Sequence, residues 1–247
     1  TILLVQVLRK SLKISEKLSL LIAVGTSICG ATAIVALAPS IKAKKSEITY
    51  AIANITIFGL FAMFLYPIFA HFLFPQDIVS AGLFLGSSIH ETAQVAGSAM
   101  IYSDQYEEPN IIAVATVTKL IRNTLMVIVI PYLAHKSMSV QEKSYKISAI
   151  FPYFVIGFIV FGCIRSLGDF YFLDNEMHLA TWKNSIVFIK KIAEFFLIIA
   201  MAAVGFNTSF DNFKALGIKP FYIGLIAATT VGISSILIIS IINNISI

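Results

Sequence analysis

The chain has 247 residues, of which 58% are hydrophobic and 13% charged, and its formal net charge is +5. Soluble domains carry about 45–50% apolar and about 25% charged residues, so this composition excludes a water-soluble globular protein and indicates an integral membrane protein. The apolar residues extend along the whole chain and predict one all-α polytopic bundle; basic cytoplasmic loops account for the positive charge, so no nucleic-acid partner is expected.

The chain begins without Met, in an apolar run over residues 1–8 that resembles the end of a helix. We therefore expect further helices to precede it, and no secretion signal can be read from this start. The two cysteines, Cys29 and Cys163, both lie in apolar segments. They do not predict a disulfide framework.

Apolar segments that could each cross a bilayer follow in order. They cover residues 18–38, 47–74, 79–101, 110–133, 148–167, 186–205 and 221–242. A spanning helix needs about 20 apolar residues, so these segments make about seven crossings. We expect a multi-pass protein of the inner membrane whose main surroundings are the lipid bilayer, and a homo-oligomer is left open.

The segment 79–101 places a carboxylate, Glu91, in the middle of an apolar span. A charge there costs about 2.5–3.5 kcal/mol, so Glu91 should face a partner or water. On one continuous helix, Ser87, Glu91 and Gln94 lie on the same side, and His90 widens that side. We expect this polar stripe to be the centre of the molecule.

The next span carries two cations one turn apart, Lys119 and Arg122, with Asn123 beside them. Left unpaired together with Glu91, they would cost about 8–10 kcal/mol, so these charges should meet one another or line a wet cavity. One interpretation is a salt bridge that locks two helices. The other has Glu91 and His90 carry protons while Lys119 or Arg122 balances the charge of an anion.

Two segments look like interrupted helices and resemble each other: AVGTSICG at residues 23–30 and AVGFNTSF at residues 203–210. Paired Gly-interrupted segments indicate an inverted-repeat transporter. A restarted helix directs unpaired N–H groups and a positive dipole end at one point, which suits an anion. Residues that cap such ends are Thr26, Ser27, Asn207, Thr208 and Ser209. The alternative, that small residues only allow close helix packing, stays open.

Several motifs, taken in order, resemble the YeiH family of sulfate exporters. They are ICGATAI at 28–34, AIA at 51–53, FG at 58–59, AM at 62–63, YP at 66–67, IHETAQV at 89–95, KLIRN at 119–123 and AMAAVG at 200–205. Thr32 stands where the family has Ser. The resemblance implies about ten helices in two inverted five-helix repeats, with two broken crossing helices, as in the bile acid/arsenite/riboflavin transporter group. It also implies that N-terminal helices are missing here, so that residues 1–74 complete the first repeat and residues 75–247 form the second.

We therefore expect a secondary transporter that exports a small inorganic anion, such as sulfate or a related sulfur oxyanion, with proton coupling. The expected substrate-binding residues are Thr26, Ser27, Cys29, Gly30, Lys119, Arg122, Asn123, Asn207, Thr208 and Ser209. The expected coupling residues are His90, Glu91 and Gln94. A sodium-coupled carrier of an organic anion and a non-transporting membrane subunit remain as alternatives.

We expect no enzyme activity, no cofactor and no metal. The stretch from His90 to Gln94 lacks the second His of a zinc protease. The chain also has no Gly-rich phosphate loop that would indicate ATP-driven transport.

Overall fold

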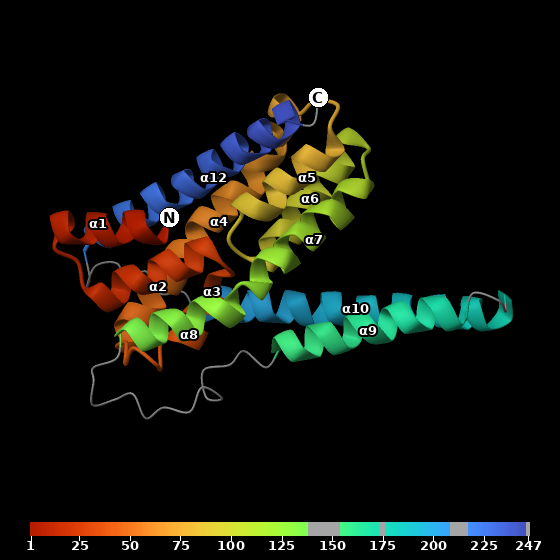
Figure 1. The fold of residues 1–247 in the computed structure, drawn as a ribbon, viewed down its shortest axis with the longest axis horizontal. Coiled ribbons are helices and arrows are strands. Elements are labelled where there is room, and N and C mark those ends of the chain that lie inside the picture. The colour runs from red at the N-terminus through yellow and green to blue at the C-terminus, as the bar shows by residue number, and fades with distance from the viewer. Residues whose placement is uncertain (138–153, 173–175, 208–216, 246–247) are drawn as a thin grey trace. The chain divides into compact units, whose positions relative to one another are not determined.

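A computed structural model describes residues 1–137, 154–172, 176–207 and 217–245 of the chain, and these residues form helices and no strand (Figure 1). The helices are α1 Ile2–Leu12, α2 Glu16–Ser27, α3 Gly30–Leu37, α4 Lys45–Leu73, α5 Ile78–Ser88, α6 Thr92–Tyr106, α7 Asn110–Thr124, α8 Met126–Ser137, α9 Phe154–Tyr171, α10 Glu176–Asn207 and α12 Lys219–Ile245. The predicted all-α membrane bundle is confirmed for this part of the chain.

The chain divides into two compact units. Residues 1–151 and 208–247 form the first, which holds α1 to α8 and α12, and residues 152–207 form the second, which holds α9 and α10. The predicted boundary between two repeats near residue 75 is a different kind of division and stays a prediction.

Three stretches of the described residues are long and apolar enough to cross a membrane. They are Lys45–Leu73, Asn110–His135 and Lys219–Asn244. They correspond to the spans expected at residues 47–74, 110–133 and 221–242. The spans expected at 18–38 and 79–101 are each interrupted, and these interruptions form the centre of the first unit.

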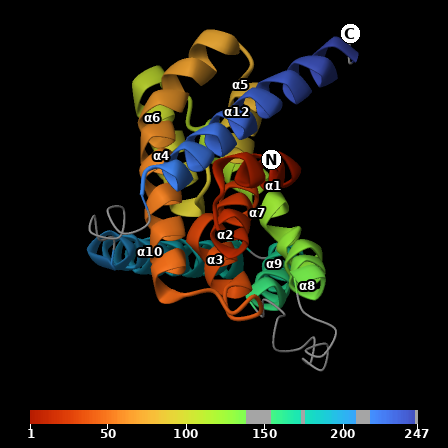
Figure 2. The same ribbon diagram turned by 90° about the vertical axis from the view of Figure 1, so that its left-hand side faces the viewer.

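The first unit contains two clusters of buried apolar side chains. One surrounds α2 and includes residues of α1, α3, α4, α8 and α12, while the other surrounds α5 and includes residues of α4, α6, α7 and α12. The helix α12 contacts α2, α4 and α5, so the last helix of the chain joins both clusters. Figure 2 shows α12 crossing α4 in this unit.

Glycines let α4 approach its neighbours closely. At Gly59 of α4, a Cβ would overlap the side-chain amide of Gln94 from α6, and at Gly224 of α12 it would overlap the side chain of Asn54 from α4. Small residues at such points allow close contact between membrane helices. The Nδ2 of Asn54 donates to the Pro220 carbonyl at 3.4 Å and so joins α4 to α12.

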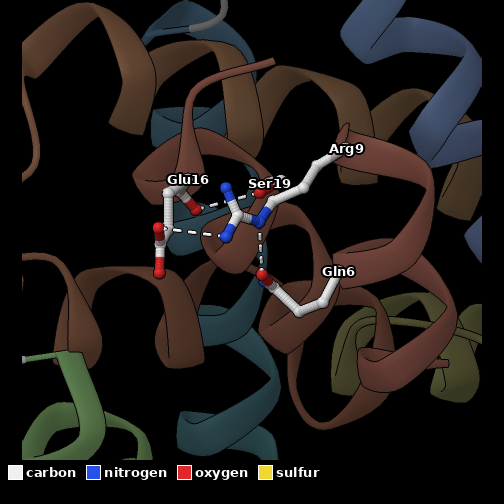
Figure 3. Close-up of polar contacts among 4 residues, drawn as sticks. All are labelled: Gln6, Arg9, Glu16 and Ser19. Carbon is white, nitrogen blue, oxygen red and sulfur yellow. Dashed lines mark hydrogen bonds and ion pairs between the residues drawn. The ribbon is translucent and has the colours of Figure 1, made fainter. Parts of the chain in front are cut away.

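Polar contacts fix the turn between α1 and α2 (Figure 3). The Nε of Arg9 donates to the Oε1 of Gln6 at 2.8 Å, and its Nη2 lies 3.1 Å from the Oε2 of Glu16. Within α2, the hydroxyl of Ser19 donates to the carbonyl of Glu16. The Glu16 side chain is mostly exposed, whereas that of Arg9 is half-buried.

In the second unit, α9 and α10 pack against each other as a hairpin. The Oδ2 of Asp169 accepts from the Nε of Arg165 at 2.7 Å, and its Oδ1 accepts from the indole of Trp182 at 2.8 Å. Gly168 leaves room for the Trp182 ring, which a Cβ there would overlap. One carboxylate therefore joins the two helices near the turn.

Candidate functional site

The first interruption lies between α2 and α3, as the sequence predicted. The α2 helix ends at Ser27 and α3 begins at Gly30, with Ile28 and Cys29 in non-helical conformations between them. Gly30 has a φ of +47°, which L side chains rarely adopt, so a glycine suits this position. The predicted break near Cys29 and Gly30 is confirmed.

The second interruption was not predicted. The span expected to be continuous over 79–101 ends as α5 at Ser88 and restarts as α6 at Thr92, and the backbone is extended at Ile89 and Glu91. Because helical periodicity stops at Ser88, the expected polar stripe along one helix side is wrong. The polar residues of this segment instead lie at or near the adjoining ends of two shorter helices, α5 and α6.

Lys119 from α7 bonds to both interruptions. Its Nζ donates to the carbonyl of Ile28, after α2, at 3.1 Å. Two further bonds reach the carbonyls of Ile89 and His90, after α5, at 2.8 and 2.6 Å. The side chain is fully buried. A fixed cation thus satisfies carbonyls that a broken helix cannot pair internally, and it faces the negative end of each helix dipole.

Arg122, one turn further along α7, repeats this arrangement. Its guanidinium donates to the carbonyls of Thr26 and Ser27 at the end of α2, the second through Nε at 2.9 Å. Its Nη1 donates to the carbonyls of Ser87 and Ile89, at 2.7 and 3.2 Å. The spacing of the two cations on α7 therefore lets one helix hold the C-terminal ends of two others.

The two interruptions meet beside α7, and we call this place the crossing. Glu91 lies there too, but it has a different partner from the one expected. Its Oε1 accepts from the backbone N–H of Ala31, in the first turn of α3, at 2.8 Å. Among the described residues, no ion pair joins Glu91 to Lys119 or Arg122. The three charges do come together, as predicted, but each is bound mainly to backbone.

The starts of the two restarted helices also touch. The Sγ of Cys29, just before α3, lies 3.7 Å from the Oγ1 of Thr92, the first residue of α6. The Nδ2 of Asn123 donates to this Thr92 hydroxyl at 3.1 Å. Two helix N-termini, each with a positive dipole end, therefore meet beside the two cations of α7.

Several buried polar atoms at this crossing have no hydrogen-bond partner in the described part of the protein. They are both ring nitrogens of His90, the Oγ of Ser27 and the Oδ1 of Asn123. His90 is only 1% exposed. Buried polar groups are nearly always hydrogen-bonded, so these atoms call for a polar partner, such as water or a ligand, that the described residues do not supply.

Most of the predicted site residues meet at this crossing: Thr26, Ser27, Cys29, Gly30, His90, Glu91, Lys119, Arg122 and Asn123. Gln94 lies apart from them, because its Nε2 donates to the Thr56 carbonyl of α4 at 3.3 Å. Sequence reasoning missed Thr92 and the Ala31 amide. The signal available was a hydroxyl residue directly after Glu91, where a helix could begin.

The other expected substrate-binding residues, Asn207, Thr208 and Ser209, lie in the second unit or outside the described residues. The helix α10 continues through Gly205 and Phe206 to Asn207, and Thr208 and Ser209 lie outside the described residues. The break expected between residues 205 and 209 therefore stays a prediction. In the described structure, the partner of the first break is the second one, at residues 89–91.

Comparison with known proteins identifies relatives along most of the chain. A family model described as "conserved hypothetical protein 698" matches residues 1–224. The chain is 30% identical to a UPF0324 membrane protein of Fusobacterium nucleatum over 96% of its length and 71% of the relative's. It is 31% identical to one of Bordetella bronchiseptica, over 88% of the chain and 64% of the relative.

A third relative, a UPF0324 membrane protein of Streptococcus agalactiae, is 31% identical over 94% of the chain and 67% of the relative. The chain thus spans about two thirds of the length of these curated relatives. No solved structure matches it. The apolar spans and the relatives' names agree on a membrane protein. The chain belongs to the family described as conserved hypothetical protein 698, together with the UPF0324 membrane proteins.

Proposed function

We propose that the protein is a multi-pass secondary transporter of the inner membrane that exports a small inorganic anion, such as sulfate or a related sulfur oxyanion. In this proposal it is a carrier without enzyme activity or cofactor. The observation that carries it is the meeting of two interrupted helices, α2/α3 and α5/α6, beside two buried cations of α7.

Interrupted helices support transport because non-helical backbone is costly inside a bilayer. It is tolerated where protein buries it or where it lines a cavity, and transporters place their substrate sites at such points. The crossing carries two cations, Lys119 and Arg122, and one carboxylate, Glu91. The excess positive charge and the two helix N-termini favour an anion.

The same geometry counts against a sodium-coupled carrier at this crossing. Sodium sites in transporters use the freed carbonyls of broken helices. Here the carbonyls of Ser27, Ile28 and Ile89 already accept from fixed cations. A sodium ion would have to displace a lysine or an arginine, so a proton is the favoured coupling ion, with Glu91 as its carrier and His90 as a relay.

The experiment is anion flux into proteoliposomes that contain the purified protein. Labelled sulfate, sulfite and phosphate are tested with an imposed proton gradient and then with a sodium gradient. We expect flux of a sulfur oxyanion that responds to the proton gradient. Flux that requires sodium would favour the organic-anion alternative, and no flux of any anion would favour the non-transporting subunit.

The coupling role is tested with Glu91→Gln, which keeps the size of the side chain and its acceptor but cannot titrate. We expect this variant to fold and to lose the pH dependence of flux. Glu47→Gln is the matched control, because Glu47 is another buried carboxylate that caps a helix, α4. An unchanged pH profile in Glu91→Gln would show that Glu91 carries no coupling proton.

A further inference from the structure

The cations at the crossing have little hydrogen-bonding capacity left for a substrate. A lysine ammonium has three donors, and Lys119 makes three bonds to backbone carbonyls. A guanidinium has five, and four bonds to carbonyls engage Arg122. The two residues therefore supply positive charge to the crossing, while the direct donors to an anion must come from elsewhere.

The N-terminus of α3 is one source of such donors, and a carboxylate already accepts from one of its N–H groups. The Oε1 of Glu91 accepts from the N–H of Ala31, and a carboxylate at a helix N-terminus marks a position suited to anions in general. Gly30 makes this approach possible, because a Cβ there would overlap the Glu91 side chain. The backbone is thus open at the point where the carboxylate lies.

A second observation places a missing partner at the same crossing. The ring of His90 is buried with both nitrogens unpaired, although its carbonyl is held by Lys119 at 2.6 Å. A buried imidazole without any partner is rare, and a ligand with polar atoms would satisfy it.

We propose that Glu91 is a tethered competitor of the transported anion. Its carboxylate holds the oxyanion position at the N-terminus of α3, and a sulfur oxyanion binds there after Glu91 takes up a proton and leaves the Ala31 amide. The inference rests on the proposed function and assigns its binding position. No covalent bond other than the O–H of Glu91 forms or breaks, and one proton enters for each anion bound.

The charged and titratable groups around Glu91 are consistent with this exchange. Lys119 and Arg122 face the crossing from α7, Cys29 lies at the start of α3, and His90 precedes Glu91 in the chain. Replacing one carboxylate by one bound anion keeps a negative group beside the two cations. Lys119 and Arg122 need not release their carbonyls, so the helices can stay in place while the bound anion replaces the Glu91 carboxylate.

The test is sulfate binding to the purified protein by isothermal titration calorimetry, from about pH 5 to about pH 9, where sulfate keeps its charge. For the wild type we expect affinity to fall as pH rises, at a limiting slope of about tenfold per pH unit, because one proton accompanies each anion. Glu91→Ala should bind sulfate with an affinity independent of pH, and more tightly than the wild type at the alkaline end.

Glu91→Gln is a second variant that keeps the test decisive if Glu91→Ala fails to fold. It should also bind independently of pH, but more weakly than Glu91→Ala, because its amide oxygen can still accept from Ala31. The control is Glu47→Ala. Glu47 is 6% exposed, and its Oε2 accepts from the N–H of Lys44 at 2.9 Å, so the variant removes a similar capping carboxylate at another helix. It should keep the wild-type pH dependence.

The inference is wrong if folded Glu91→Ala keeps the wild-type pH dependence, or if it loses binding that the wild type has. It is also wrong if neither protein binds sulfate, sulfite or phosphate at any pH. The expected binding pattern without flux in proteoliposomes would leave the inference standing and overturn the proposed transport function. The two claims can therefore fail separately.

Discussion

The two interruptions of the first unit differ in what stabilises their non-helical backbone. Between α2 and α3 the chain has Gly30 in a left-handed conformation, which few other residues adopt. Between α5 and α6 it has neither Gly nor Pro, and the extended backbone at Ile89 and Glu91 is open to any residue. The first break is therefore encoded locally, whereas the second depends on partners from distant parts of the chain.

Those partners are Lys119 and Arg122, which serve both breaks at once. If the second break depends on them more than the first, variants of α7 should affect α5 and α6 most. Variants of Gly30 should instead affect α2 and α3.

Lys119→Met should lower the free energy of unfolding by about 3–5 kcal/mol, because it leaves the buried carbonyls of Ile28 and His90 without their donor and the carbonyl of Ile89 with Arg122 alone. Thermal unfolding in detergent measures the loss, and hydrogen exchange should locate it at residues 87–92 more than at 26–30. Lys17→Met is the control, since the Nζ of Lys17 donates to the Lys42 carbonyl at an exposed site. A stable Lys119→Met with weakened anion binding would instead make Lys119 a direct substrate ligand.

Gly30→Ala should cost about 2 kcal/mol, because alanine is strained at a φ of +47° and its methyl group overlaps Glu91. In a Glu91→Ala background the overlap disappears and only the backbone strain remains, so the cost should fall. Urea or thermal unfolding of the four proteins gives this double-mutant cycle. Gly97→Ala is the control, because its Cβ would meet only the flexible Met63 side chain. Equal costs in both backgrounds would contradict the close approach of Glu91.

Asp77→Ala should cost about 1 kcal/mol at neutral pH, because Asp77 caps the start of α5 through the Ser80 amide at 2.9 Å. Comparison with Lys119→Met tests whether the N-terminal end of α5 contributes less to the free energy of unfolding than its C-terminal end at the break. Burial alone would raise the pKa of Asp77, but hydrogen bonds from Ser80 and Asn243 outweigh it and hold the pKa below its usual value.

A lowered pKa in the folded protein means that the Asp77 contribution is present above the ordinary aspartate pKa of about 3.9 and is lost as pH falls through the folded value. The stability difference between wild type and Asp77→Ala should therefore be constant near neutral pH and shrink in acid. Thermal unfolding measured across the acidic range checks this. A difference that grows in acid would contradict the hydrogen bonds assigned to the carboxylate.

Arg9→Ala should have the smallest effect, about 0.5 kcal/mol, because the Arg9–Glu16 pair is partly exposed (Figure 3). The loss should decrease further at high salt, which screens exposed charges. Unfolding midpoints at low and high ionic strength provide the measurement. A loss as large as that of Lys119→Met would mean that α1 supports the crossing in a way that its contacts do not indicate.

The sequence predicted the features whose causes are local. Gly30 and its small neighbours indicated the first break, and the buried charges indicated that Glu91, Lys119 and Arg122 come together. The second break escaped prediction because its cause is a lysine some 30 residues away, whose bond to Ile89 no local pattern reveals. Charges in a membrane were expected to pair with charges. In the described structure, the partners of both cations are instead carbonyls at broken helix ends.

The bonds from Lys119 also constrain how the protein is made. The carbonyl of Ile28 receives its donor from a residue 91 positions later. At about 5–20 residues per second, the ribosome needs roughly 5–18 s to deliver it. In a bilayer an unsatisfied carbonyl costs several kcal/mol, so the α2/α3 break is less stable among lipids during that interval than in the folded protein. Gly30 fixes where the chain breaks, but the full stability of the break arrives only when α7 leaves the insertion machinery.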